Sequence, residues 1–183
     1  MPELNTSVWD EFRAGNERAF ERIFLAYYDS LYGYGMRLAN HQEIVKDCLQ
    51  SLFHRLWQRR AKLGAVEEIR PYLFKALRNE VAAELKAQRR RTELHQSSPQ
   101  EFTVQFSVED FLVAQQLTTE QHAHLLAGLG QLNNRQREAV HLRFFDGFAY
   151  ERIAEIMELQ PQSVRNLLHQ SIKRLRSAWP LPA

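Results

Sequence analysis

The stretch LNNRQREAVHLRFFDGFAYERIAEIMELQPQSVRNLLHQSIKRLR, residues 132–176, decides the fold of the second half of the chain. Its apolar side chains recur at intervals of three and four residues, which is the spacing of an amphipathic helix. The pattern predicts helices over about 135–144, 150–157 and 162–176. Asn134 stands directly before the first of them, where an Asn side chain caps a helix well.

The last two expected helices are separated by only three residues, Glu158–Gln160. Pro161 favours the start of a helix, and Ala154 is small enough to let two helices cross closely. A short helix, a tight turn and a longer basic helix form the helix-turn-helix arrangement, whose second helix enters the major groove of DNA. The sequence therefore predicts a DNA-binding unit at this end of the chain.

The outward side chains of the 162–176 helix are of the types that contact DNA. Arg suits guanine, Gln and Asn suit adenine, and cations further along the helix suit phosphates. The candidates for base edges are Gln162, Ser163, Arg165 and Asn166. The candidates for phosphates are His169, Lys173, Arg174 and Arg176. The alternative is an ordinary solvated helix face that is basic by chance.

The first half of the chain is also helical in pattern, with apolar stripes at helical spacing and short breaks between them. The expected helices are 8–14 capped by Ser7, one that follows its cap Asn16, 42–62, and one from about Pro71 to Arg91.

Charge is distributed unevenly along the chain, although the net charge is only +2. Residues 1–91 carry a net +4, and residues 135–183 carry +3. Residues 92–134 contain five acids with neither Lys nor Arg, a net −5. Such asymmetry suggests two modules that meet a polyanion. We expect an all-α protein with small domains at 1–91 and 119–183, joined by an acidic linker at 92–118.

Composition excludes several classes of protein. Of 183 residues, 44% are hydrophobic and 25% charged, which is ordinary for a globular chain. Seven Gly and six Pro argue against a turn-rich β-sandwich. The single cysteine, Cys48, forms no internal disulfide, which suits a reducing cytosol. No apolar run is long enough to cross a bilayer and no leader follows Met1, so we expect a cytoplasmic protein without membrane insertion.

The linker region has one further pattern. Apolar and polar residues alternate over 102–108, which suits either a short strand or an extended segment whose aromatics dock on a partner or on the modules. A helix is expected over about 119–132.

Candidate chemistry is sparse. The aromatics and cations between Trp57 and Asn79 could hold unpaired DNA, although Trp57, Phe74 and Leu77 more simply fill the core. The histidines are scattered and no phosphate-binding glycine loop occurs. Cys48 suits a buried position better than a nucleophilic one. We expect no catalytic residue, no metal site, no cofactor and no small-molecule substrate.

Three stretches together resemble the extracytoplasmic-function (ECF) sigma factors of bacterial RNA polymerase. GNERAFERIFLAYYDSLYGYGMRLA (15–39) is similar to the opening of the family's first domain. VKDCLQSLFHRLWQRR (45–60) resembles its signature helix Asp-x-x-Gln-x-x-Phe-x-x-x-Trp, and residues 132–176 resemble its second domain. The resemblance covers about 10–90 and 115–177.

The resemblance implies a function and the residues that perform it. Such a protein binds core RNA polymerase and directs it to promoters, while the polymerase performs the chemistry. The clamp of the polymerase would be bound by Asp47, Gln50 and Arg55. The melted minus-ten strand would be held by the loop after that helix and by Arg78 and Asn79. The duplex minus-thirty-five element would be read by Gln162, Arg165 and Asn166 while this domain packs on the polymerase flap. The linker would run toward the active-site channel.

The sequence departs from the family pattern at a few positions. Ser51 stands where an acid is usual, Ala149 and Gln160 replace the usual helix caps, and Glu158 replaces the turn glycine. An anti-sigma factor is implied as a partner. The alternative hypothesis is a stand-alone helix-turn-helix regulator that binds DNA without polymerase, with the first module as a sensor. A helical enzyme or scaffold is a third possibility, without a site to support it.

Overall fold

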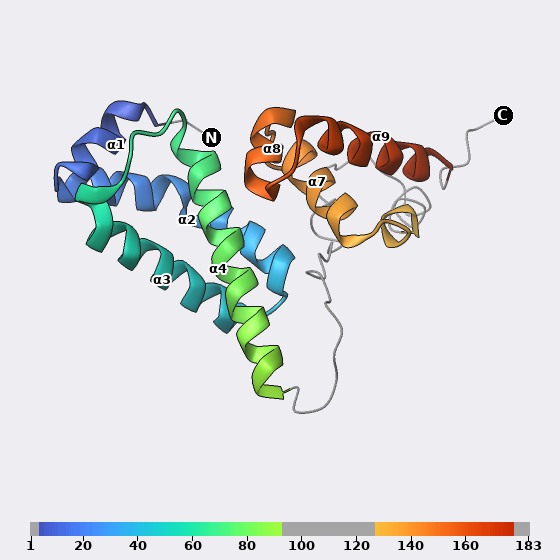
Figure 1. The fold of residues 1–183 in the computed structure, drawn as a ribbon, viewed down its shortest axis with the longest axis horizontal. Helices are drawn as coiled ribbons and strands as arrows, with labels where there is room; N and C mark the ends of the chain where they lie inside the picture. The colour runs from blue at the N-terminus through green and yellow to red at the C-terminus, as the bar shows by residue number, and fades with distance from the viewer. Residues whose placement is uncertain (1–3, 93–126, 178–183) are drawn as a thin grey trace. The chain divides into compact units, whose positions relative to one another are not determined.

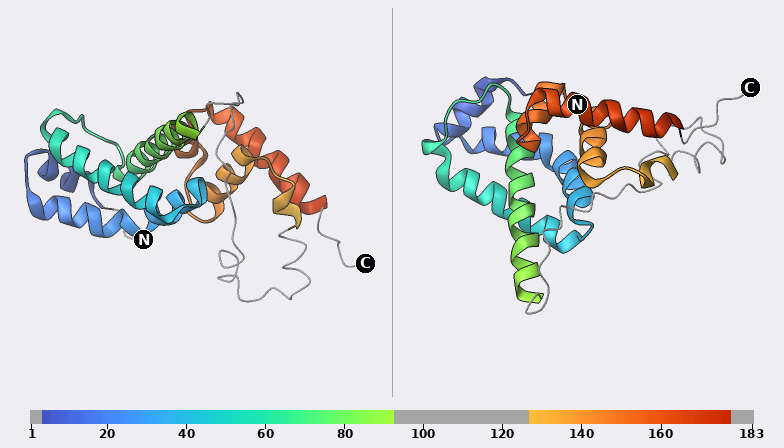
Figure 2. Two further views of the ribbon diagram at one scale, coloured as in Figure 1. Left: turned by 90° about the horizontal axis from the view of Figure 1, so that it is seen from below. Right: turned by 45° about the vertical axis from the view of Figure 1, so that its right-hand side comes forward.

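The computed structural model of this chain describes residues 4–92 and 127–177. Within these ranges every regular element is a helix, so the expected all-α class is confirmed. The chain divides into two compact units, the first built mainly from α1 to α4 and the second mainly from α7, α8 and α9 (Figures 1 and 2). None of the described helices combines the length and the apolar character that a bilayer crossing requires.

The first unit is a bundle in which α2 packs against α1, α3 and α4, and α3 packs against α4 (Figure 1). Its core contains the large side chains of Trp9, Tyr34 and Phe74, each no more than 1% exposed. Tyr34 and Phe74 stack with their ring centroids 5.0 Å apart, which joins α2 to α4. The elements are α1 (Thr6–Arg13), α2 (Glu17–Ala39), α3 (Gln42–Arg59), the 3₁₀ turn η1 (Arg60–Lys62) and α4 (Ile69–Thr92).

A glycine allows α2 and α3 to approach closely. A Cβ atom placed on Gly35 would lie 2.7 Å from Cγ1 of Val45, closer than real Cβ atoms come to a neighbour. Val45 is fully buried, so its side chain has no room to move away. This contact fixes the spacing of the two helices.

The caps of the first unit agree only in part with expectation. Asn16 caps α2 as predicted, accepting from the backbone N–H groups of Arg18 and Ala19. The predicted cap Ser7 is wrong: α1 begins at Thr6, and the Asn5 side chain accepts from the N–H of Ser7 at 3.3 Å. Asn5 is the cap because it directly precedes the first helical residue, whereas Ser7 already lies inside the helix.

The expected fourth helix starts earlier than predicted. It begins at Ile69, two residues before Pro71. Pro71 is still within the first turn, where a backbone N–H has no partner inside the helix, so proline is tolerated there. The expected third helix is α3 followed by η1.

The second unit contains α7 (Asn134–Phe144), α8 (Tyr150–Met157) and α9 (Pro161–Ser177), with α7 packed on α9. The cap of α7 is Asn133, so the prediction of Asn134 is wrong by one residue. Asn133 accepts from the N–H of Gln136 at 2.9 Å, and the Gln136 side chain accepts from the N–H of Asn133 at 3.1 Å. This capping box requires the glutamine three residues after the cap, which selects Asn133.

The turn between α8 and α9 departs from the usual chemistry, as the sequence indicated. Glu158 adopts the left-handed conformation with φ of 55°, which favours glycine. The turn after α8 nevertheless closes, because the N–H of Leu159 donates to the carbonyl of Ala154 at 2.9 Å. At the other end of α8, Ala149 occupies the N-cap position and forms no side-chain hydrogen bond there.

Some expectations fall outside the described residues. These are the linker 92–118 beyond Thr92, including the alternation at 102–108, and residues 119–126 of the expected helix 119–132. Of that helix, residues 127–130 are described and helical, and a turn follows them.

Cys48 lies in α3 and is buried. Burial raises the pKa of its thiol from 9.0 to about 11, with Glu84 and Asp47 adding to the rise and Arg55 opposing it. At pH 8 only about one thiol in a thousand is then ionised, and the thiolate is the nucleophile.

We therefore expect iodoacetamide to alkylate Cys48 in the folded protein at least tenfold more slowly than in the urea-unfolded chain. The native rate should rise with each unit of pH up to the pKa. Quenched labelling followed by mass spectrometry measures both rates. Equal rates in the two states would contradict the burial of this thiol.

Candidate nucleic-acid and protein interfaces

The outward face of α9 is open to solvent. All eight predicted DNA-contacting residues on this helix are exposed: Gln162, Ser163, Arg165, Asn166, His169, Lys173, Arg174 and Arg176. The opposite face is held in the unit by Val164 and Leu168, which are buried. The helix therefore presents these polar and basic side chains on one surface, as base and phosphate contacts from a single helix require.

Three of the candidate base-reading side chains already have partners on this surface. Nη2 of Arg165 lies 3.5 Å from Oε1 of Glu151 on α8, and both side chains are more than half exposed. Nε2 of Gln162 donates to Oδ1 of Asn166 at 3.2 Å. Exposed pairs of this kind contribute little to stability. They hold the side chains in place without preventing an exchange for a base edge.

Arg174 has a structural role that the sequence did not indicate. Its Nη1 donates to Oε1 of Gln136 at 2.9 Å and to the carbonyl of Gln131 at 3.2 Å. Gln136 is 1% exposed, so its amide oxygen needs donors from within the protein. Arg174 therefore ties α9 to the start of α7. Its side chain is still exposed, and its contact with phosphate stays a prediction.

The segment between α7 and α8 is fixed by Arg143. Its Nη1 donates to the carbonyl of Phe148 at 3.0 Å, and its guanidinium lies 5.1 Å from the centre of the Tyr150 ring. Nearby, Nε2 of His141 lies 3.3 Å from Oδ2 of Asp146. These contacts set the direction in which α8 leaves α7, and so the position of the turn before α9.

In the first unit, α3 presents the predicted polymerase-binding residues in different directions. Asp47 and Gln50 are exposed and three residues apart, so they share one face. Arg55 lies further round the helix and forms an ion pair with Glu80 of α4. The structure therefore brings Asp47 and Gln50 together, while Arg55 also joins α3 to α4.

An open groove of about 510 Å³ runs between α2 and α3 beside Gln50. Its aromatic wall continues from α2 to α3, with the Phe24 and Phe53 ring centroids 4.9 Å apart and those of Phe20 and Trp57 5.2 Å apart. The groove is lined by Phe20, Phe24, Tyr28, Lys46, Leu49, Gln50, Phe53, His54 and Trp57. Helical spacing placed Phe20 and Phe24 on the apolar stripe of one helix and Trp57 on that of the next. The spacing did not indicate that these three rings stay partly exposed.

Arg78 and Asn79, the predicted minus-ten contacts, are consecutive residues in the middle of α4. Asn79 is exposed, whereas Arg78 is partly buried. The expected core residues of this helix, Phe74 and Leu77, are fully buried, so their role in packing is confirmed. Asn79 is thus the more accessible of the two.

The described part of the chain holds no cluster of three or more residues suited to bind a metal ion. Sequence reasoning missed the acidic residues that form ion pairs with the predicted polymerase- and DNA-binding arginines. Glu80 and Glu151 each pair with an arginine on another helix. Such pairs leave no trace in the spacing of a single helix.

Two family models match the chain. The model described as sigma-70 region 2 matches residues 23–91, and the model described as sigma-70 region 4 matches residues 123–175. The RNA polymerase sigma factor CarQ of Myxococcus xanthus is 25% identical over 167 residues, which is 91% of this chain and 92% of that protein. The ECF RNA polymerase sigma factor BldN of Streptomyces coelicolor is 26% identical, over 92% of this chain and 63% of that protein.

Two solved structures share the fold. CnrH, solved in complex with the cytosolic domain of CnrY, gives a TM-score of 0.64 at 16% identity over 94% of both chains. The sigma factor RpoE of Bartonella quintana, solved with the anti-sigma factor NepR, gives 0.63 at 20% identity over 87% of this chain and 95% of that one.

The two matched regions together span most of the chain and fall on its two helical units in order. A stand-alone regulator, the alternative hypothesis, would have no need of region 2. The chain therefore belongs to the ECF group of the sigma-70 family, the initiation factors that bind core RNA polymerase and direct it to promoters.

Proposed function

We propose that residues 1–91 bind the polymerase clamp and the minus-ten strand, and that residues 119–183 bind the minus-thirty-five element and the flap. Residues 92–118 link the two and run toward the active-site channel, where their acidic character imitates nucleic acid. The observation that carries this division is that regions 2 and 4 match separate helical units. On this proposal the protein is not an enzyme and acts in the cytoplasm, beside the polymerase and the chromosome.

The polymerase contact is centred on Asp47 and Gln50. They are exposed on one face of α3, and Gln50 also lines the aromatic groove. A helical partner would place polar groups against the two side chains and apolar groups in the groove, the usual combination at a protein interface. Arg55 is half exposed and contributes from the edge while it keeps its ion pair with Glu80. Ser51, where the family usually has an acid, lies on the same helix and weakens one contact.

The promoter contacts lie on α4 and α9. The loop Leu63–Glu68, called here the α3–α4 loop, leads into α4, where Arg78 and Asn79 meet the melted minus-ten strand. At the start of α9 the exposed side chains read the minus-thirty-five bases; these are Gln162, Ser163, Arg165 and Asn166. Further along the helix, His169 and Lys173 meet phosphates. An anti-sigma factor is a further proposed partner, because the related RpoE was solved bound to one.

Reconstituted transcription tests the proposal. Purified protein is added to core RNA polymerase on a library of genomic fragments, and the start sites are mapped by sequencing. We expect initiation at a limited set of promoters that share minus-ten and minus-thirty-five elements. A core enzyme that neither binds the protein nor changes its start sites would refute the proposal.

We expect Arg165→Ala to reduce selectivity at one or two base pairs of the minus-thirty-five element. A bidentate arginine–guanine contact discriminates by about 1–3 kcal/mol, roughly five- to 150-fold. Initiation rates on templates with single substitutions measure the effect. Glu151→Ala is the matched control, because it removes the Arg165 partner but leaves the arginine free to reach a base. An unchanged base preference in Arg165→Ala would remove this residue from the recognition set.

A further inference from the structure

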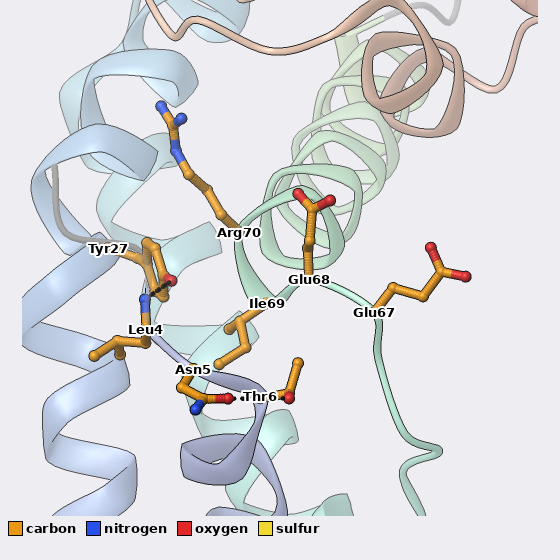
Figure 3. Close-up of a pocket in the computed structure, with 8 residues that line it drawn as sticks. All are labelled: Leu4, Asn5, Thr6, Tyr27, Glu67, Glu68, Ile69 and Arg70. Atoms are coloured by element: carbon orange, nitrogen blue, oxygen red, sulfur yellow. Dashed lines mark hydrogen bonds between the residues drawn. The ribbon is translucent and has the colours of Figure 1, made fainter.

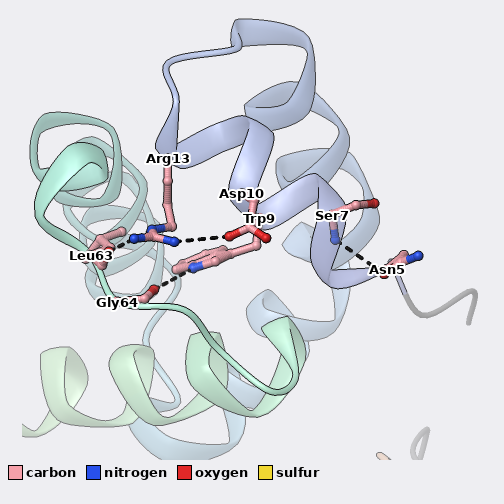
Figure 4. A network of polar contacts seen from close by, with 7 residues as sticks. All are labelled: Asn5, Ser7, Trp9, Asp10, Arg13, Leu63 and Gly64. Carbon is pink, nitrogen blue, oxygen red and sulfur yellow. Dashed lines mark hydrogen bonds and ion pairs between the residues drawn. The ribbon is translucent and has the colours of Figure 1, made fainter.

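The side chains of α1 hold the α3–α4 loop at its start (Figure 4). Nε1 of Trp9 donates to the carbonyl of Gly64 at 2.9 Å, and Nε of Arg13 donates to the carbonyl of Leu63 at 2.7 Å. These bonds join residues about fifty positions apart in the chain. Two successive backbone carbonyls of the loop are thus bound by one helix, which fixes the direction in which the chain leaves η1.

The Trp9 donor of α1 is itself held rigidly. Trp9 is 1% exposed, and its ring packs edge-on against Tyr72 of α4, with centroids 5.1 Å apart. The Arg13 guanidinium also pairs with Asp10, Nη1 to Oδ1 at 3.1 Å. Because the Trp9 ring is fixed in the core, the loop conforms to it. The Asp10 side chain is 64% exposed, and an exposed pair of this kind contributes little to the position of Arg13.

Residues Leu4–Thr6, at the start of α1, also flank the end of the loop that leads into α4 (Figure 3). A pocket of about 310 Å³ lies between Leu4–Thr6 and Glu67–Arg70, with Tyr27 of α2 beside them. The backbone N–H of Leu4 donates to the Tyr27 hydroxyl at 3.2 Å, which fastens this segment to the bundle. The loop therefore meets the N-terminal part of the chain at both of its ends.

We infer that Trp9 and Arg13 are positioning residues that set the conformation of the α3–α4 loop and thereby its selectivity for the minus-ten strand. The inference rests on the proposed function of that loop. The region 2 match begins at residue 23, so α1 lies outside it and the match assigns these residues no role. They act through Leu63 and Gly64 and need not touch DNA.

Three variants separate the contributions. Trp9→Phe keeps an aromatic ring in the core and removes the N–H donor. Arg13→Ala removes the donor to Leu63 together with the Asp10 pair. Asp10→Ala is the matched control, since it breaks the ion pair and leaves the bond from Arg13 to Leu63 in place. Thermal unfolding of each variant confirms that the protein is folded.

The measurement uses the holoenzyme on templates with single substitutions in either promoter element. Losing one hydrogen bond corresponds to a change of about threefold to tenfold. We expect Trp9→Phe and Arg13→Ala to lose about that much discrimination at the minus-ten element. Their discrimination at the minus-thirty-five element and their affinity for core enzyme should stay as in the wild type. Asp10→Ala should match the wild type throughout.

A general loss of stability would lower initiation on all templates alike and leave both discrimination ratios unchanged. That outcome, beside a wild type that discriminates at the minus-ten element, would overturn the inference alone. A wild type indifferent to minus-ten substitutions would overturn the proposed function of the loop and this inference with it. Faster amide hydrogen exchange over residues 63–68 in both variants is the expected structural result.

Discussion

Asp47→Lys should lower the affinity for core RNA polymerase by about thirtyfold or more, with the same relative loss on every promoter. Reversing a charge at the centre of a protein interface replaces an attraction by a repulsion, and changes of this kind cost about 2–5 kcal/mol. Asp47 is exposed beside Gln50, and the structure gives it no ion pair within the described part of the chain. The substitution should therefore leave the fold intact.

The matched control is Glu21→Lys, which makes the same change of charge on the exposed side of α2. Core binding is measured by competition with a labelled sigma factor, and initiation is measured on several promoters at saturating protein. Saturation should restore initiation by the Asp47 variant. A loss confined to particular promoters would contradict the assignment of Asp47 to the clamp and place it near the DNA instead.

The helix-turn-helix and the two-unit organisation could be predicted because their signals are local. The three-residue break before Pro161, the buried Ile153 and Val164, and the exposed side chains of α9 all follow from helical spacing. The left-handed Glu158 was also visible as a departure at a glycine position. Information within one or two turns of a helix was enough for the helices and their faces, whereas the departure at Glu158 was visible only against the family pattern.

Features that depend on distant residues could not be predicted. Two examples are the ion pair of Arg55 with Glu80 and the hydrogen bond from Trp9 to Gly64. Each joins two elements, and the sequence does not show which faces of those elements meet. Arg174 carried the same basic signal as Lys173 but turns to the buried Gln136. Capping errors of one or two residues have a related cause, since Asn133 and Asn134 are equally good caps and only the Gln136 side chain decides between them.

Phe74→Ala should destabilise the first unit by about 3–5 kcal/mol, the usual cost of removing a buried phenyl ring. Phe74 is 0% exposed and stacks on Tyr34, so removing its ring would leave a cavity between α2 and α4. Domains of this size have only about 5–15 kcal/mol of stability. A large part of the first unit's stability would be lost, and both proposed functions of that unit would weaken together.

Ile153→Ala makes the corresponding change in the second unit, at a cost of about 2–5 kcal/mol, because Ile153 is also 0% exposed. Hydrogen exchange read by mass spectrometry reports each unit separately. Phe74→Ala should speed exchange in α2 and α4 about a hundredfold or more while α7 and α9 stay protected, and Ile153→Ala should do the reverse. Phe144→Ala is the control, because that ring is 58% exposed and its loss should change stability by no more than about 0.5 kcal/mol. If either core variant speeds exchange equally in both units, the units unfold as one, and the division of function between them loses its structural basis.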